Sequence, residues 1–516
     1  MGGLRPRPTE DGLPPPTVIV SPEAGRGRFA EARTSSLPGK GEAGALDGPP
    51  SRPLVIGAGP AGLTAALELV RFGVAPLVVE KGLLMGGLAR TEERKGYRFD
   101  IGGHRFYTKV AEVEDLWGEM LGAEFRRTRR LSRIFYRNRF FKYPLEPLDA
   151  LAGLGPVESL RIGLSYMAER LRRRPEPQNF QEWVVRAFGR RLFEVFFETY
   201  TEKVWGLKCT EISAEWAAQR IRKLSLAGAV VDALRGGGGE GSLIREFGYP
   251  RLGPGMMWER FAEVVAGAGG RIVTGVEVTE LRRKGDRIEE VVGLREGREV
   301  TYETDHVIST MALRDLIARI RPAPPEDVTR AAADLKYRAF IIVVLVIRDP
   351  SLFPDNWIYI HEPGLRVGRI QNFKNWSEDL VPDADTTSVG LEYFCTEGDD
   401  LWESGDEALV ELARDELERL GLAGSAAVEE GFVIRQPDAY PVYDPAYREN
   451  LATIRGFLDT IENLDTIGRN GMHRYNNQDH SMVTGLLAVR NLYGESHDLW
   501  SVNMERSFYE TFQVPR

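Results

Sequence analysis

Gly57-Ala58-Gly59-Pro60-Ala61-Gly62 stands between a short apolar run, residues 53–56, and a stretch with helical periodicity, residues 63–72. Gly73 follows that stretch, and residues 76–80 form a second, mostly apolar run. Two strands joined through a helix in this way lie parallel in one sheet. The sequence therefore predicts a βαβ unit at residues 53–80.

The spacing of the three glycines is typical of a turn that binds the phosphates of a dinucleotide. The first permits the tight turn, the second lets a pyrophosphate approach the backbone, and the third lets the helix pack closely on the strand. The free N–H groups at the start of the helix attract phosphate. A simple tight turn is the alternative, which the strand and helix on either side disfavour. The predicted contacts are Gly57, Gly59, Pro60, Ala61 and Gly62.

An acidic residue and a second glycine pair follow this unit. Glu80 ends the second strand, where a carboxylate can accept hydrogen bonds from ribose hydroxyls. Gly86-Gly87-Leu88-Ala89-Arg90 resembles the segment that follows the dinucleotide turn in amine-oxidase-type flavoproteins. NAD and FAD share the first motif, so this second segment favours FAD as a bound prosthetic group. The predicted contacts here are Glu80, Lys81, Gly87, Leu88, Ala89 and Arg90.

Composition narrows the class of protein. The 516 residues include 67 Lys and Arg against 76 Asp and Glu, a formal charge of −9, which disfavours a nucleic-acid binder. Two cysteines are too few for a disulfide framework or a cysteine zinc site. The longest apolar run, residues 340–347, is far shorter than the about 20 residues of a membrane span and predicts a buried strand. No signal peptide is visible, and we expect a cytoplasmic protein.

We predict an α/β fold (α+β overall), with a Rossmann-type FAD-binding domain, a helical insertion and an antiparallel-sheet substrate domain. The Pro- and Gly-rich start of the chain predicts a disordered tail, and Gly236–Gly241 predicts a flexible boundary. The expected divisions are a tail, 1–50; a discontinuous FAD-binding domain, 51–109 with 244–312 and 455–516; a helical insertion, 110–243; and the substrate domain, 313–454.

Three further stretches resemble the flavoproteins of the UDP-galactopyranose mutase family. They are Gly102-Gly103-His104-Arg105-Phe106-Tyr107-Thr108, Tyr200-Thr201-Glu202-Lys203-Val204-Trp205-Gly206 and Gly468-Arg469-Asn470-Gly471-Met472-His473-Arg474-Tyr475. Weaker similarities surround Tyr337, Arg369 and Tyr440, so the resemblance covers roughly residues 53–495. It implies further cofactor contacts at Gly102, Gly103, His104, Val278, Gly468, Arg469, Tyr475, Asn476, Asn477 and Gln478.

The resemblance also implies a substrate site. Tyr200 and Trp205 can stack on a flat base, although packing in the core is the alternative for both. Guanidinium groups suit a diphosphate, and Arg220 or Arg222 stands near the position of the family's mobile-loop arginine. The substrate contacts predicted by resemblance are Tyr200, Trp205, Arg220, Arg222, Tyr337, Arg369, Tyr440 and Arg474, and the catalytic residues are His104, Arg369 and Arg474. No histidine spacing indicates a metal site.

The chain departs from the family at several positions. Asn476-Asn477-Gln478 replaces Leu-Asp-Met, His473 replaces Tyr, and Tyr107 replaces His. These changes leave the sugar unspecified. The basic stretch Arg126–Lys142 has no counterpart. We expect a solvated helical face, and the alternatives are peripheral contact with an anionic lipid membrane surface or contact with a partner.

The resemblance implies an enzyme that rearranges a nucleotide-linked sugar through N5 of reduced FAD, in a pyranose/furanose mutase-type reaction of cell-surface glycan biosynthesis. NAD(P)H is a candidate reductant and a homodimer a candidate assembly. An FAD-dependent oxidoreductase of the protoporphyrinogen oxidase or carotenoid desaturase type, which takes hydride from an apolar substrate, is the alternative. A catalytically silent flavin-binding scaffold is the third reading.

Overall fold

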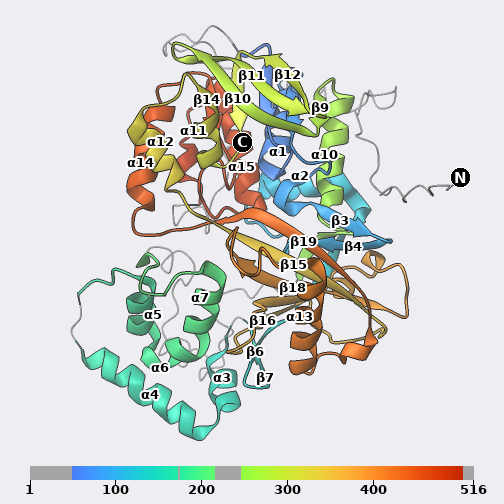
Figure 1. Cartoon of the computed structure of the whole chain (residues 1–516), viewed down its shortest axis with the longest axis vertical. Helices are drawn as coiled ribbons and strands as arrows, with labels where there is room; N and C mark the ends of the chain where they lie inside the picture. Colours follow the sequence, from blue (N-terminus) through green and yellow to red (C-terminus); the bar gives the residue numbers. More distant parts are fainter. Residues whose placement is uncertain (1–48, 144, 173–174, 215–245, 504–516) are drawn as a thin grey trace, which may run out of the picture.

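A five-stranded parallel sheet forms the upper half of the molecule (Figure 1). The computed structural model describes residues 49–143, 145–172, 175–214 and 246–503. The sheet joins four distant parts of the chain, in the order β20 (Leu464–Thr466), β13 (His306–Ser309), β1 (Pro53–Ile56), β2 (Leu77–Glu80) and β9 (Arg271–Thr274). The helix between β1 and β2 is α1 (Pro60–Arg71), so the predicted βαβ unit is confirmed.

Both faces of this sheet are covered, as a parallel sheet requires. Val55 of β1 packs on one side with the first set of helices, while Leu54 and Ile56 point to the other side, because side chains alternate along a strand. The first set comprises α1, α2 (Ala111–Leu121), α10 (Gly255–Gly267) and α15 (Gln478–Leu492). The other face meets α11 (Leu313–Arg319), α12 (Glu326–Ala333), α14 (Tyr447–Leu458) and a sheet of β12 (Arg298–Glu303), β11 (Arg287–Arg295), β10 (Val276–Lys284) and β14 (Ile320–Arg321).

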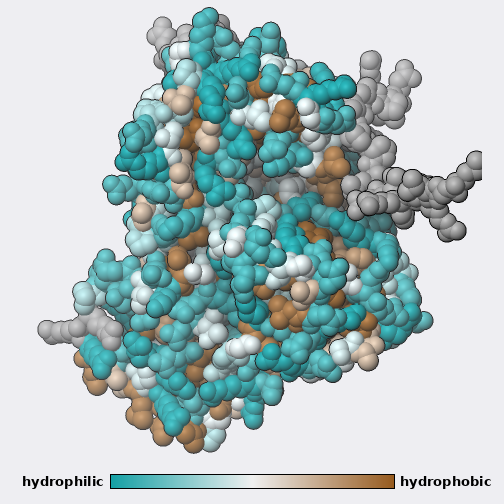
Figure 2. Space-filling view, in the orientation of Figure 1, coloured by the Kyte–Doolittle hydropathy of each residue, from teal (hydrophilic) through white to brown (hydrophobic). Residues whose placement is uncertain are grey.

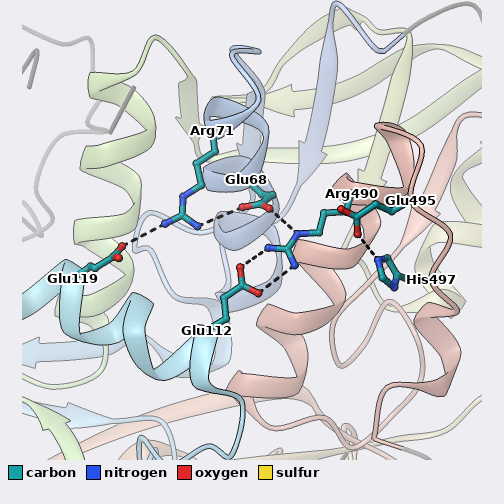
Figure 3. Close-up of polar contacts among 7 residues, drawn as sticks. All are labelled: Glu68, Arg71, Glu112, Glu119, Arg490, Glu495 and His497. Carbon is teal, nitrogen blue, oxygen red and sulfur yellow. Dashed lines mark hydrogen bonds and ion pairs between the residues drawn. The ribbon is translucent and has the colours of Figure 1, made fainter. Parts of the chain in front are cut away.

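A buried arginine fastens three of these helices together (Figure 3). Arg490 of α15 donates from Nε to Glu68 of α1 over 2.9 Å, and its Nη atoms bind both carboxylate oxygens of Glu112 of α2. The Arg490 and Glu68 side chains are only 7% and 5% exposed. Arg71 pairs with the same Glu68 and with Glu119 at longer distances, 3.5 and 3.4 Å. The ion pairs of Arg490 therefore hold α1, α2 and α15 in one arrangement.

We expect Arg490→Met to lower the free energy of unfolding by about 3–5 kcal/mol, because Glu68 would stay buried without its main cation. Arg71→Met is the matched control, with an expected loss of about 1 kcal/mol or less for a half-exposed pair. Urea unfolding of the two variants measures the difference. Equal losses of unfolding free energy in the two variants would contradict the role of Arg490 as the residue that holds the three helices together.

A seven-stranded sheet forms the second half, in the order β19 (Val428–Pro441), β15 (Tyr337–Ile347), β18 (Thr387–Cys395), β17 (Arg369–Asn372), β16 (Trp357–Ile360), β6 (Ser132–Tyr136) and β7 (Arg139–Lys142). All neighbours are antiparallel except β16 and β6. Every residue of β15 is buried, which confirms the buried strand predicted from the apolar run at 340–347. Ile341 packs under α13 (Asp406–Arg419), whereas Phe340 and Ile342 lie on the other face of the sheet, in the cluster that contains Phe180, Val184 and Phe196.

The helical interpretation of the basic stretch Arg126–Lys142 is wrong. These residues form β5 (Phe125–Arg129), which pairs with β8 (Glu246–Pro250), and the β6–β7 hairpin. Arg137 and Asn138, both with positive φ, make the two-residue turn that hairpins favour, and Arg133 is neutralised by buried Asp355. The predicted insertion at 110–243 thus supplies two strands to the sheet predicted at 313–454. A small hairpin, β3 (Thr91–Arg94) and β4 (Tyr97–Asp100), lies between the halves.

The helical segment proper comprises α3 (Pro147–Leu154), α4 (Pro156–Leu171), α5 (Phe180–Phe188), α6 (Arg190–Phe193) and α7 (Thr199–Trp205). It stands apart at the lower left of Figure 1. Within the described ranges, none of the helices has both the length and the apolar character needed to cross a bilayer. The predicted disordered tail (up to residue 48), the Gly236–Gly241 boundary, Arg220 and Arg222 lie outside the described residues.

Candidate functional site

A cavity of about 1960 Å³ runs between the two halves and the helical segment. Its walls include the glycine turn after β1, the carboxyl end of β2, the Gly-Gly segment and the start of α15. Strands β6, β16, β17 and β19 of the seven-stranded sheet also contribute. The cavity lies at the carboxyl ends of parallel strands, where open α/β sheets bind their ligands. Most residues predicted as cofactor or substrate contacts therefore share one continuous space.

The glycine turn is built so that only glycine fits at its ends. Gly57 has φ +101°, and a Cβ there would stand 2.0 Å from Oγ1 of Thr310. A Cβ on Gly62 would stand 1.9 Å from the carbonyl oxygen of Gly57. Gly59 differs, because a Cβ there would meet no protein atom closer than 3.8 Å and the residue lines the cavity. Its missing side chain keeps the space over the N-terminus of α1 open.

Backbone hydrogen bonds hold the acidic residue and the second glycine segment beside this turn. Glu80 accepts from the Ala58 N–H at 2.6 Å and from the Gly82 N–H at 2.7 Å. Burial raises its pKa, although these hydrogen bonds oppose that shift. The Gly86 N–H donates to the Ala58 carbonyl at 2.8 Å, which fixes the two glycine segments against each other.

The turn after Gly87 places Arg90 in the cavity wall. Arg90 donates to Glu92 at 2.7 Å, to the Gly87 carbonyl at 3.0 Å and to Gln436 at 2.7 Å. The remaining predicted cofactor contacts Lys81, Leu88, Ala89, Gly102, Gly103 and Val278 also line the cavity.

His104 lines the middle of the cavity as a neutral ring. Burial, together with the positive charges of Arg469, Arg369 and Arg90, lowers its pKa to about 3. Its Nδ1 is buried and has no hydrogen-bond partner among the described residues. The imidazole is therefore available to a bound molecule as an uncharged donor or acceptor.

Arg369 is the most enclosed cation of the cavity. Its Nε donates to Glu392 at 2.6 Å, its Nη2 donates to the Tyr440 hydroxyl at 2.7 Å, and both partners are buried. Burial is the largest single influence and lowers the pKa of Arg369, but Glu392 and the neighbouring tyrosines together raise the pKa well above the usual value. The guanidinium lies over the rings of Trp357 and Phe394, at 5.0 and 4.7 Å from their centroids. Arg369 is thus a fixed positive charge at pH 7.

A second guanidinium lies nearby on the same aromatic cluster. Arg469 stands 4.8 Å from the ring centroid of Tyr440 and 4.2 Å from that of Tyr475, and these two rings stack at 5.6 Å. Trp205 packs against both tyrosines, at 6.2 and 6.0 Å. Tyr440 therefore contacts both arginines, and the cavity has two cations at one aromatic wall.

Tyr200 lines the same space but is already stacked. Its ring lies parallel to the His361 ring at 4.6 Å and edge-on to Tyr359 at 5.6 Å. Sequence reasoning missed Trp357, Tyr359 and His361, which line the cavity from β16 and the residue after it. The only indication in the sequence was that aromatic residues alternate along this strand, a pattern that residues of a hydrophobic core show equally well.

The buried helix α15 begins at the cavity. Asn477 caps it, and His480 accepts from the Asn477 N–H at 3.3 Å. Asn476 donates to the Gly468 carbonyl at 2.9 Å, while Gln478 donates to the Arg105 carbonyl at 3.2 Å. The positive end of a 15-residue helix therefore faces the space beside His104 and favours negative charge there.

Two predicted substrate contacts do not reach the cavity. Arg474 points the other way and donates to the carbonyls of Trp500 and Val502. Tyr337 packs edge-on against His473 at 4.8 Å, under Arg314. The structure therefore does not bring the predicted catalytic Arg474 to His104 and Arg369. Across the described ranges, no three His, Cys, Asp or Glu side chains gather in a way that could hold a metal ion.

Comparison with known proteins identifies the architecture. The model of the family "Flavin containing amine oxidoreductase" matches residues 60–441. The chain belongs to this family. It is an FAD-dependent flavoenzyme, and its resemblance to UDP-galactopyranose mutase also appears in the relatives below.

A probable UDP-galactopyranose mutase of Klebsiella pneumoniae is 26% identical over 180 residues, 31% of this chain and 42% of that protein. The chain thus spans less than half of this curated relative. A crystal structure of reduced UDP-galactopyranose mutase superposes with a TM-score of 0.78 at 21% identity, covering 90% of this flavoenzyme and all of that chain. A crystal structure of a putative protoporphyrinogen oxidase from Exiguobacterium superposes with a TM-score of 0.66 at 15% identity, covering 86% of this chain and 98% of that one. At these identities the two structures establish the fold alone.

The residues of the flavoenzyme's cavity fit FAD. The glycine turn and the N-terminus of α1 leave a backbone-lined cradle for a pyrophosphate, and Glu80 lies beside it. Farther along, several buried polar atoms of the lining have no hydrogen-bond partner within the described residues, among them Nδ1 of His104, Nε of Arg469 and Oε1 of Gln478. Polar atoms that are buried without partners in this way are costly, and a ring with polar edges would satisfy them.

The buried histidines make stability depend on pH. The folded pKa values of His104, His361 and His473 are lowered to about 3, 3 and 4, mainly by burial, from 6.5. Between the unfolded and folded pKa values, the unfolded chain binds more protons than the folded chain. The stability is therefore fully present above pH 6.5 and is lost progressively as the pH falls to about 3. Each histidine adds a slope of up to about 1.4 kcal/mol per pH unit.

His473→Asn should reduce the slope of the unfolding free energy against pH by up to about 1.4 kcal/mol per pH unit, the contribution of one histidine. His473 has φ +46°, a conformation that Asn tolerates. Urea unfolding at a series of pH values measures the slope, and His497→Gln, at an exposed histidine paired with Glu495, is the control. An unchanged slope in His473→Asn would show that this histidine titrates normally.

Proposed function

We propose that this flavoenzyme acts on a nucleotide-linked sugar in a pyranose/furanose mutase-type reaction, in which reduced FAD supplies N5 as the nucleophile. The observation that carries the proposal is the pair of guanidinium groups of Arg369 and Arg469 on one aromatic wall of the cavity. A diphosphate is the anion that two such groups bind best, and burial strengthens the attraction. The motif similarity to the mutase family supports the same substrate class.

In this proposal the protein positions the substrate and excludes water. Arg369 is held by Glu392 and Tyr440, and no described residue accepts a hydrogen bond from its Nη1, which leaves that donor for a phosphate oxygen. Trp205 and Tyr200 border the same space and present aromatic surface to a base. The neutral imidazole of His104 would form a hydrogen bond with the ring of a bound flavin.

The proposal extends to a cytoplasmic enzyme of cell-surface glycan biosynthesis that uses NAD(P)H as its reductant. The pathway and the reductant follow from the resemblance to the mutase family, and the location follows from the lack of a visible signal peptide in the sequence.

An FAD-dependent oxidoreductase that takes hydride from an apolar substrate is the second candidate. One observation favours it: the helical segment lines its end of the cavity with apolar side chains. They are Leu145, Ala150, Leu151, Phe180, Phe188, Leu192, Phe196 and Phe197. This lining suits an apolar group, but it does not explain the buried Arg369 and the half-buried Arg469 at the other wall.

Reaction of the dithionite-reduced enzyme with a panel of nucleotide sugars tests the proposal. We expect one sugar to interconvert between ring forms and to become attached to the flavin when cyanoborohydride is added. The oxidised enzyme with the same panel is the control and should do neither. If no sugar reacts, and an apolar donor bleaches the oxidised flavin, the oxidoreductase assignment replaces this one.

A further inference from the structure

Helix α4 presents a stripe of exposed apolar side chains on the outer edge of the helical segment. Their exposed fractions are 65% for Val157, 64% for Leu160, 63% for Leu164, 57% for Met167 and 83% for Leu171. No other large apolar side chain in the described part of the chain exceeds 45%. Spacings of three and four residues place all five on one side of the helix. Figure 2 shows hydrophobic surface at the lower left, where Figure 1 places α4.

The opposite side of α4 anchors it to the protein. Ile162 and Tyr166 are buried there, and Glu158 and Glu169 are buried beside them. Positions 158, 162, 166 and 169 lie about half a turn from the apolar stripe. The stripe therefore points away from the rest of the structure, over a length of about 21 Å from residue 157 to residue 171.

The charges of α4 are sorted between its two sides. Its only acidic residues, Glu158 and Glu169, face inward and pair with arginines, Glu158 with Arg191 and Glu169 with Arg172 at 3.2 Å. Arg161 and Arg170 flank the stripe on opposite sides, and both are exposed. Arg161 also pairs with Glu158 at 3.5 Å, and Arg170 donates to the Tyr166 hydroxyl at 2.9 Å. The outward face of α4 thus combines apolar side chains with arginines and carries no carboxylate. A second copy docked on this face would bring like charges together, whereas anionic lipid headgroups would neutralise them.

We propose that α4 binds the surface of a membrane that contains anionic lipids. The helix lies in the plane of the interface, its apolar stripe enters the boundary of the acyl chains, and the flanking arginines bind headgroup phosphates. This surface is distinct from the basic stretch Arg126–Lys142, which lies in strands. The adjoining α3 lines the apolar end of the cavity through Ala150 and Leu151, so docking would bring that end close to the membrane. The inference does not rest on the proposed reaction.

Flotation of the full-length holoenzyme with vesicles tests the proposal. We expect binding to phosphatidylcholine vesicles that contain phosphatidylglycerol, and much weaker binding to phosphatidylcholine alone. Leu160→Gln/Leu164→Gln should weaken binding about 100-fold, tenfold for each leucine no longer buried. Arg161→Gln/Arg170→Gln should weaken it about 25-fold on anionic vesicles only. All four side chains are exposed and lie outside the cavity, so flavin content should stay unchanged. The arginine variant also loses the Arg161–Glu158 ion pair and the Arg170–Tyr166 hydrogen bond, so we expect its midpoint of thermal unfolding to fall by a few degrees.

Leu131→Gln/Leu294→Gln is the matched control, because it removes two exposed leucines elsewhere, 38% and 43% accessible, and should bind like the unmodified enzyme. Equal binding to neutral and anionic vesicles would overturn the proposal. Self-association through the stripe would also overturn the proposal. In that case the unmodified enzyme is a dimer in sedimentation equilibrium, Leu160→Gln/Leu164→Gln is a monomer, and neither binds vesicles.

Discussion

Gly59→Val is expected to yield a folded protein without flavin. A Cβ on Gly59 would meet protein atoms only at 3.8 Å, and its φ of −84° suits any residue, so the fold accommodates the change. The new side chain would instead occupy the space over the N-terminus of α1, where the pyrophosphate of FAD would bind backbone N–H groups. Losing two charge-assisted hydrogen bonds of about 1.5–3 kcal/mol each weakens FAD binding at least about 100-fold.

Flavin absorbance per chain after purification, and urea unfolding of flavin-free protein, measure the two effects separately. Gly118→Val, at an open position on α2, is the matched control and should keep its flavin. Gly62→Ala provides the contrast, because its Cβ would clash with the Gly57 carbonyl and should destabilise the flavin-free protein too. Full flavin content in Gly59→Val would refute the assignment of the cradle.

Arg369→Gln is expected to affect both folding and substrate binding, and a second substitution separates the two. The single change leaves Glu392 fully buried without its cation and should lower the free energy of unfolding by about 3–5 kcal/mol. Arg369→Gln/Glu392→Gln removes both charges and should recover most of that loss. It should not recover binding of UDP to the reduced enzyme, which we expect to be about 100-fold weaker than in the unmodified enzyme.

Urea unfolding and calorimetric titration with UDP give the two quantities. Glu392→Gln alone is the control, because it keeps the guanidinium in the cavity and should retain measurable UDP binding. If the double variant binds UDP as tightly as the unmodified enzyme, Arg369 has a structural role only, and the proposed diphosphate site fails with it.

Local chemistry made part of this site predictable. The glycine turn, Glu80 and the Gly-Gly segment follow one another within residues 57–90, and each residue type is dictated by its own backbone position. The buried strand at 340–347 was predictable for the same reason, because a run of β-branched residues needs no distant partner to be recognised.

Contacts between distant residues were not predictable. Glu392 pairs with Arg369 because the register of β17 and β18 sets them directly opposite, and nothing near either residue indicates that register. The motif that contains Arg469 and Arg474 could not indicate which of the two side chains points into the cavity. The chain turns at His473, which has positive φ, so that Arg469 faces the cavity and Arg474 faces away. The strands β5–β7 were missed because arginines dominate their composition and obscure the alternation.

The strands of the parallel sheet come from distant parts of the sequence, and this affects how the protein folds during synthesis. Strands β1 and β2 leave the ribosome first, but their neighbours β9, β13 and β20 follow about 190, 230 and 390 residues later, counted from β2. Until then the early βαβ unit has unpaired strand edges and lacks α15, the helix that packs on α1. We therefore expect cofactor loading to follow synthesis of nearly the whole chain, and the unpaired strand edges of the nascent protein to be open to aggregation until then.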